Sequence, residues 1–303
     1  MSIQTIDPKD ISQSELYGYL SSTIAPRPIC FASTIDSQGS VNLSPFSFFN
    51  VFSSNPPIMV FSPVRSGRDN TNKHTFQNIM EKKEVVINVV NYPIVEQMSL
   101  SSTAYDKGVN EFVKSGLTQV SSEKVSPPRI GEAPVAFECV VDKVIELGQE
   151  PGAGNLIIAR VVLIHVQEQY LDEADKLDTT KLDLVARMGD NWYCRASGDA
   201  LFEIPKPLRT KGIGVDQLPK SIRNSKVLTG NNLGRLGNLE QIPPYEEIQE
   251  TRNLEEVQVI LEENINDPES CVLALHALSK IWLEEGDTKQ AIQLLMIADA
   301  LMG

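Results

Sequence analysis

Long apolar runs are missing from this 303-residue sequence. No stretch approaches the roughly twenty apolar residues that a membrane-spanning helix needs. The first seven residues have neither the basic start nor the apolar centre of a signal peptide. We therefore expect a cytoplasmic protein with no membrane segment. The length exceeds that of a typical single domain, so we also expect two units or one domain with an extension.

Cysteine and histidine are scarce, with four and three copies. The copies are scattered and no two cysteines form a Cys-x-x-Cys pair, which argues against a zinc knuckle or a redox dithiol. We expect free, buried thiols and no metal site. The Gly-x-Gly-x-x-Gly fingerprint of a dinucleotide-binding fold is also missing. The residues concerned are Cys30, Cys139, Cys194, Cys271, His74, His165 and His276.

Negative charge is unevenly distributed along the chain, whose net charge is −13. Residues 245–303 hold thirteen Asp and Glu against three Lys and Arg, a charge of −10, which leaves −3 for residues 1–244. Neither part has the basic excess of a nucleic-acid-binding protein, so we expect no nucleic-acid partner.

Runs of β-branched and other apolar residues predict strands at 29–35, 58–61, 85–90, 135–145 and 156–167. A turn sequence at 36–39 predicts a hairpin, and a short helix is expected at 75–83. The elements show no βαβ rhythm, so the pattern indicates a mainly β fold, an antiparallel barrel rather than a Rossmann sheet. His165 lies in the last of these strands and is interpreted as a structural histidine.

Residues 42–75 join an aromatic segment to a cationic one. The first half sets serines and Asn50 among four phenylalanines, which predicts a flat apolar wall beside polar groups. The second half gathers hydroxyls, Arg65 and Lys73 near Gly67, and these groups suit a phosphate dianion. The helix expected at 75–83 would aim its first amides at the same anion. A solvated polar loop is the alternative interpretation. A ligand with a flat ring and a phosphate, such as flavin mononucleotide (FMN), suits an apolar wall beside an anion site.

Arg27 stands between two prolines at the entrance of a predicted strand. Because proline fixes the local backbone, the direction of the Arg27 side chain is restricted. It either faces a ligand or pairs with a local carboxylate. A second group of aromatic and arginine residues, at 192–195, is interpreted as packing.

The C-terminal third differs in amino-acid composition from the rest. Residues 205–244 are rich in Gly, Pro and Asn and predict a long ordered arm with little regular structure that wraps over a neighbouring surface. Residues 245–303 predict helices, including one hairpin of the tetratricopeptide (TPR) type between Ala274 and Ala291. A single such hairpin cannot form a solenoid, so we expect it to pack on something else.

Several motifs together give residues 10–200 a resemblance to the flavin reductase-like family, which includes flavoredoxin and the reductase components of two-component monooxygenases. They are Pro26-Arg27-Pro28, Ser33-Thr34, residues 42–50, Asn55-Pro56-Pro57, Ser62, and Lys73-His74-Thr75 with Asn78. The resemblance implies an FMN-binding split β-barrel of antiparallel, Greek-key type over residues 1–204, in a homodimer with FMN near the interface. Residues 205–303 lie outside it.

The resemblance also implies the site residues. Residues 44–50 would line the flavin ring and ribityl chain, with Ser47 and Phe48 nearest, and Ser62, Arg65, Lys73 and Thr75 would hold the phosphate. His74 replaces the Asp that the family often has. The complete cofactor-binding set comprises Arg27, Asn42, Ser44, Pro45, Phe46, Ser47, Phe48, Asn50, Ser62, Arg65, Lys73, His74 and Thr75.

The leading hypothesis is an NAD(P)H-dependent flavin reductase, in which the flavin carries the chemistry and the protein orients it. This explains why no triad or paired-carboxylate signature is needed. Arg27 is the candidate for stabilising the reduced flavin. One alternative is an FMN-containing electron carrier that is reduced by a protein partner instead of NAD(P)H. The other is a non-catalytic interaction protein that docks partners through its helical tail. A protein electron acceptor or a monooxygenase component is a further expected partner.

Overall fold

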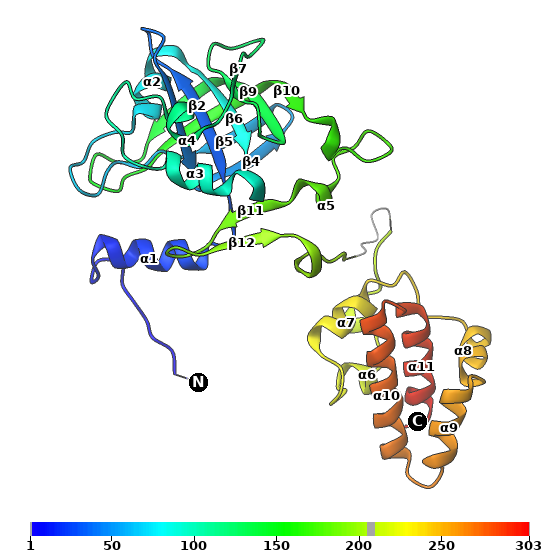
Figure 1. Cartoon of the computed structure of the whole chain (residues 1–303). Coiled ribbons are helices and arrows are strands. Elements are labelled where there is room, and N and C mark those ends of the chain that lie inside the picture. The colour runs from blue at the N-terminus through cyan, green and yellow to red at the C-terminus, as the bar shows by residue number, and fades with distance from the viewer. Residues whose placement is uncertain (1, 205–209, 303) are drawn as a thin grey trace. The chain divides into compact units, whose positions relative to one another are not determined.

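A computed structural model describes residues 2–204 and 210–302 (Figure 1). The chain divides into two compact units, Met1–Phe202 and Glu203–Gly303, here called unit 1 and unit 2. Unit 1 contains the strands and unit 2 is helical. In the part of the chain that the structure describes, no helix is long and apolar enough to span a bilayer.

Unit 1 is built around a seven-stranded antiparallel sheet in the order β3-β2-β6-β9-β10-β5-β4. Three hairpins supply six strands, and β6 joins them by pairing with both β2 and β9. The predicted antiparallel, sheet-rich fold is confirmed, but β3 and β4 are edges and no closed barrel is found among the described residues. The strands are β2 (Cys30–Ile35), β3 (Val41–Phe46), β4 (Phe49–Ser54), β5 (Pro57–Phe61), β6 (Glu84–Val89), β9 (Val135–Glu146) and β10 (Asn155–Val166).

Strand β2 is buried on both faces because successive side chains point in opposite directions. Cys30 and Ala32 join a core that α2 (His74–Lys82) covers through Phe76 and Ile79. Phe31 joins a second core on the other face, to which α3 (Val95–Ser101) and α4 (Glu111–Ser115) contribute. The start of α2 is thereby held against β2 and β3.

A smaller sheet packs beside the main one and has the order β1-β11-β12. The helix α1 (Gln13–Thr23) precedes it and begins with a capping box between Ser12 and Glu15. The strands are β1 (Arg27–Pro28), β11 (Leu184–Arg187) and β12 (Tyr193–Ala196). The remaining elements of unit 1 are η1 (Tyr92–Ile94), β7 (Gln119–Val120), β8 (Arg129–Ile130), η2 (Glu168–Tyr170), α5 (Thr179–Leu182) and η3 (Gly198–Ala200).

The four phenylalanines that predicted one flat wall point in different directions. Phe46 and Phe49 pack against the core, and the Phe46 ring centroid lies 5.3 Å from that of Phe61. Phe48 and Phe52 are exposed, the latter by 68%. A continuous wall is therefore a wrong expectation, because the core of the sheet takes two of the four rings.

Residues 210–244 are not the extended arm that the sequence predicts. They contain η4 (Val215–Gln217), α6 (Lys220–Arg223) and α7 (Gly230–Gly237). Leu218, Ile222 and Leu236 are fully buried in the core of unit 2. The prediction failed because all three helices are short and α7 is rich in Gly and Asn, so their buried apolar side chains do not form a long periodic pattern. The part of the prediction that falls on residues 205–209 lies outside the described residues.

The rest of unit 2 is a group of four helices, α8 (Tyr245–Arg252), α9 (Glu255–Glu263), α10 (Pro268–Glu285) and α11 (Thr288–Ala300). The predicted hairpin is formed by α10 and α11, which are separated by Gly286 at a φ of 96°. It packs against α6–α9 of its own unit, and one apolar cluster runs through all of them. The surface that this hairpin was expected to need is therefore supplied within unit 2.

Candidate functional site

The N-terminal end of α2 presents an open helix terminus. No side chain caps it, since Lys73 occupies the cap position and accepts only the intrahelical bonds from Phe76 and Gln77. Lys73 is exposed, and among the described residues no carboxylate lies within ion-pair distance of its ammonium group. An uncapped helix start beside a free cation has the donors and the positive potential that an anion requires.

Two pairs of buried polar side chains fix this helix to the sheet. Asn42 Nδ2 donates to Thr75 Oγ1 at 2.9 Å, and Asn78 Nδ2 donates to Thr34 Oγ1 at 3.2 Å. All four side chains are buried. The structure thus joins Asn42 and Thr75, two predicted site residues 33 positions apart, and their hydrogen bond sets the position of the helix start.

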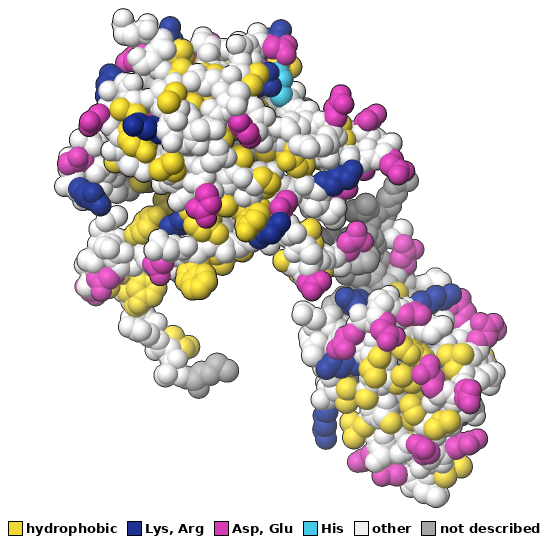
Figure 2. Space-filling model, in the orientation of Figure 1, with side chains coloured by type: hydrophobic (Ala, Val, Ile, Leu, Met, Phe, Trp, Pro, Cys, Tyr) yellow, Lys and Arg dark blue, Asp and Glu magenta, His cyan; other side chains and the backbone are white. Residues whose placement is uncertain are grey.

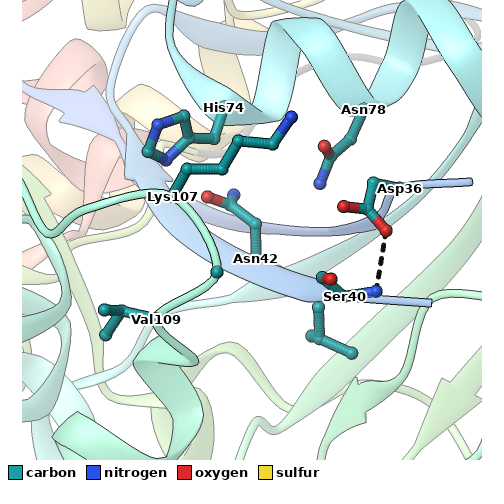
Figure 3. Close-up of a pocket in the computed structure, with 9 residues that line it drawn as sticks. Asp36, Ser40, Asn42, His74, Asn78, Lys107 and Val109 are labelled. Atoms are coloured by element: carbon teal, nitrogen blue, oxygen red, sulfur yellow. Dashed lines mark hydrogen bonds between the residues drawn. The ribbon is translucent and has the colours of Figure 1, made fainter. Parts of the chain in front are cut away.

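A small pocket lies next to this helix start, between β3 and the loop at Lys107 (Figure 3). His74 and Lys107 lie together at one end of it, and Asp36 lies with Ser40 at the other (Figure 3). The Ser40 backbone N–H is the largest of the interactions that hold the pKa of Asp36 below its ordinary value. With a volume of about 10 Å³ the pocket has room for a single water and not for a flavin ring.

The predicted phosphate loop, residues 62–73, folds back against the hairpin between β9 and β10. Its first residue, Ser62, is buried, and Ser62 Oγ accepts the backbone N–H of Asn155 at 3.1 Å. Arg65 closes the loop from inside, donating to the Asn70 side-chain and backbone oxygens at 2.7 Å each. The Arg65 guanidinium is thus already engaged by the loop itself, while Lys73 remains available.

Asn155 is a site residue that the sequence reasoning missed. Its Nδ2 donates to Pro63 O at 2.9 Å and to Asn72 Oδ1 at 3.4 Å, while its buried Oδ1 has no partner among the described residues. The sequence signal was weak, since Asn155 is a polar residue directly before the apolar run 156–159 in a strand that also contains Arg160 and His165.

The aromatic end of the predicted site is arranged around Arg27. Its guanidinium is buried and donates to the carbonyls of Ser21, Ile24 and Met188, the last at 2.9 Å. Burial is the main cause that lowers the pKa of Arg27. Arg27 therefore fastens the end of α1 to the β11–β12 hairpin, and within residues 2–204 and 210–302 it forms no ion pair with a carboxylate. Its role toward a flavin stays a prediction.

Phe48 is the exposed aromatic side chain at this end. Its ring lies 5.9 Å from the Arg27 guanidinium carbon and 6.2 Å from the Tyr17 ring centroid. Ser47 Oγ is 3.5 Å from Arg27 Nε. Among the other predicted residues, Ser44, Pro45 and Phe46 are half-buried on β3 and Asn50 is exposed at the start of β4, where its Oδ1 accepts the Val51 N–H.

These features define an antiparallel-sheet protein with an uncapped helix start suited to an anion and an exposed aromatic residue in the same unit. The family model described as "Flavin reductase like domain" matches residues 22–181, which is more than half of the chain. The chain belongs to this family.

Known relatives match about two thirds of the chain. An uncharacterized protein from Aquifex aeolicus is 35% identical over 196 residues, which are 65% of this chain and 97% of that protein. The crystal structure of nitrilotriacetate monooxygenase component B from Bacillus cereus is 28% identical with a TM-score of 0.62, covering 67% of this chain and all of that one. A flavin reductase with a split barrel domain from Shewanella frigidimarina is 27% identical with a TM-score of 0.56, covering 65% and 94%.

Proposed function

We propose that the chain binds FMN in unit 1, with the phosphate at the start of α2, and that it accepts hydride from NADH or NADPH. The observation that carries the proposal is the uncapped helix start beside the unpaired Lys73, in a chain of the flavin reductase-like family. The donor set fits a phosphate: free first-turn amides, one ammonium group and the Ser62 hydroxyl. The unpaired Asn155 Oδ1 near the same loop is suited to a donor from a ligand or its water.

The chain's own residues would bind and orient the reactants. Lys73 and the α2 amides would hold the phosphate, and the Asn42–Thr75 hydrogen bond keeps that helix start in place. Phe48 would present an apolar face to the ring, and Arg27, 5.9 Å from Phe48, would contribute positive potential near it. FMN, when bound, would supply the hydride-accepting ring. No side-chain nucleophile is required.

The first test is an FMN titration of purified apoprotein followed by absorption and fluorescence. We expect saturable quenching of flavin fluorescence and, under anaerobic conditions, bleaching of the flavin by NADH or NADPH. Protein that leaves FMN fluorescence unchanged contradicts the proposal.

An electron carrier is the main alternative within this family. It predicts bound FMN that neither NADH nor NADPH bleaches but that a reduced protein partner does. The same anaerobic mixing experiment therefore separates a reductase from a carrier.

We further propose that unit 1 forms a homodimer through α1 and β4. Ile24 and Leu20 on one element, and Val51 and Phe52 on the other, are more than half exposed, and Tyr17 of α1 contacts Phe48 beside β4. Figure 2 shows hydrophobic side chains gathered over the α1 region. An apolar surface next to a free sheet edge is unfavourable in water. Light scattering should give the dimer mass, and Phe52→Asp should reduce it to the monomer mass.

The third candidate, an interaction role for the helical tail, draws support from a surface cavity of about 340 Å³ in unit 2. Its walls come mainly from α9 and the start of α10, with Leu261, Ile265 and Cys271 among its apolar residues. A chain cut after residue 202 would test it. Unchanged oligomeric state and retained partner binding after this cut would contradict the candidate.

A further inference from the structure

Asn155 lies where three segments of unit 1 meet. It is the first residue of β10 and only 1% exposed. Its backbone N–H donates to Ser62, at the start of the phosphate loop, and its side-chain amide donates to Pro63 and to Asn72, at the end of the loop. One side chain thus ties the two ends of a loop whose middle forms hydrogen bonds within itself and with the β9–β10 hairpin.

The hydrogen bonds of Ser62 decide whether its hydroxyl is free to donate to a ligand. Ser62 Oγ accepts the Asn155 N–H, and the Ser62 backbone N–H donates to Phe48 O at 2.9 Å. The hydroxyl hydrogen is therefore left to donate elsewhere. A phosphate oxygen, which only accepts when ionised, is the partner that such a hydroxyl suits.

The backbone at Gly154 lies close to the same Ser62 hydroxyl. A Cβ at Gly154 would lie 2.7 Å from Ser62 Oγ, closer than any real contact of this kind. The strand and the loop also exchange backbone hydrogen bonds, from Arg65 N to Ala153 O at 2.9 Å and from Gly152 N to Arg65 O at 3.1 Å. These backbone bonds hold the loop at Arg65, and the Asn155 side chain joins Pro63 to Asn72.

We propose that Asn155 is a positioning residue that makes the site select a phosphorylated flavin over an unphosphorylated one. By joining Pro63 to Asn72 it places the Ser62 hydroxyl and the Lys73–α2 helix start around the same volume. The inference rests on the proposed FMN site. It assigns phosphate selectivity to a residue that need not touch the ligand.

The test compares dissociation constants for FMN and riboflavin, which differ by the phosphate alone. In Asn155→Ala we expect FMN affinity to fall roughly tenfold or more, because hydrogen bonds on both sides of the loop are lost. Riboflavin affinity should stay within about twofold, since the ring contacts are elsewhere. Asn155→Asp keeps the side-chain size but places a carboxylate near the phosphate, so its FMN affinity should be lower still and should recover as the pH falls.

A matched control is Asn88→Ala. Asn88 is also fully buried and makes two side-chain hydrogen bonds, to Val86 O and from Ile130 N, but lies on β6 away from the loop. It should destabilise the protein and leave the FMN-to-riboflavin ratio unchanged. If Asn155→Ala does not fold, Asn72→Ala removes only the acceptor at the far end of the loop and should lower the ratio to a smaller extent.

The possible outcomes are distinct. Wild-type protein that binds neither flavin overturns the proposed function and this inference with it. Wild-type protein that prefers FMN, together with Asn155 variants that keep the same preference, overturns the role of Asn155 alone. Equal weakening of FMN and riboflavin in Asn155→Ala but not in Asn88→Ala also overturns it, because the residue would then support the whole site.

Discussion

Unit 1 and unit 2 bury their polar groups in different ways. In unit 1 the buried side chains of Asn42, Glu138 and Asn155 bond to partners far away in the sequence and so fasten separate elements together. The core of unit 2 joins α6–α11 mainly through Leu, Ile, Val and Ala side chains, and the buried polar residues described there, Thr251, His276, Ser279 and Gln293, include no Asp, Glu, Lys or Arg. Helices satisfy their own backbone groups, whereas a sheet crossed by long loops needs side chains to satisfy theirs. The polar network of unit 1 also supplies the groups that suit a ligand.

The largest expected effect on stability comes from Glu138, in the polar network of unit 1. This fully buried carboxylate accepts the N–H groups of Glu123, Lys124 and Val125 and lies 2.6 Å from His165 Nε2. Glu138→Ala would leave these donors unpaired in the interior, so we expect a loss of roughly 3–5 kcal/mol in the free energy of unfolding. Urea denaturation followed by circular dichroism measures it.

The pH dependence of Glu138 has a defined sign. Burial favours the neutral acid, but the Glu123 N–H, His165 and the Lys124 N–H outweigh it and hold the pKa of Glu138 below its ordinary value. The stabilisation by Glu138 is therefore present above the pKa of the unfolded carboxyl, about 4.3, and is lost as the pH falls through the lower folded value. The control is Glu132→Ala, since Glu132 accepts the Thr118 N–H at the surface. Equal losses in the two variants would contradict this account.

The apolar side of the comparison is tested in unit 2 with Leu283→Ala. Leu283 is completely buried in the cluster that joins the helices. We expect a loss of about 3 kcal/mol in the stability of unit 2, the usual cost of a leucine-sized cavity, and no change in FMN affinity. Trp282 is buried in the same cluster, and the only other tryptophan, Trp192, lies in unit 1. In a Trp192→Phe background, emission therefore follows unit 2 alone. A loss of FMN affinity in Leu283→Ala would contradict this expected difference between the two units.

A charge reversal at Lys73 tests the proposed function of the polar unit. In Lys73→Glu we expect FMN affinity to fall roughly ten- to a hundredfold, because an attractive charge at the helix start becomes a repulsive one. Lys82→Glu is the matched control, as it makes the same charge change at the other end of α2. Fluorescence titration measures both. Similar effects of the two changes would show that net charge, and not the helix start, governs binding.

The sequence was sufficient for most strands of the sheet because these strands carry strong local patterns, but it did not predict β4 as a strand. The strands predicted at 29–35, 85–90, 135–145 and 156–167 correspond to β2, β6, β9 and β10 within a residue or so at most ends. The pairing order of the sheet depends on contacts between distant segments, and no local pattern specifies it. The prediction of one flat phenylalanine wall in 46–52 failed for the same reason. The direction of each ring depends on which face of the folded sheet is covered.

The candidate site was predictable only in part. The helix start at Lys73 follows from local sequence, and the structure leaves it uncapped as an anion site requires. Asn155 could not be found, because its importance comes from hydrogen bonds to residues more than 80 positions away. The true environment of Arg27 was also hidden, since the Met188 carbonyl that it binds lies 161 positions away in the sequence.

The smallest expected effect comes from one of the buried polar residues of unit 2, His276. Its Nδ1 lies 2.8 Å from Ser225 Oγ, and its Nε2 has no partner among the described residues. Burial lowers the pKa of His276 and outweighs the opposite effect of Asp299. The unfolded histidine therefore binds a proton at a higher pH than the native one does, so unit 2 should lose stability as the pH falls below about 6.5. We expect a decrease of a few degrees in the melting temperature followed by Trp282 emission, and a flatter pH profile in His276→Gln. A profile that this substitution leaves unchanged would place the acid sensitivity of unit 2 in another group.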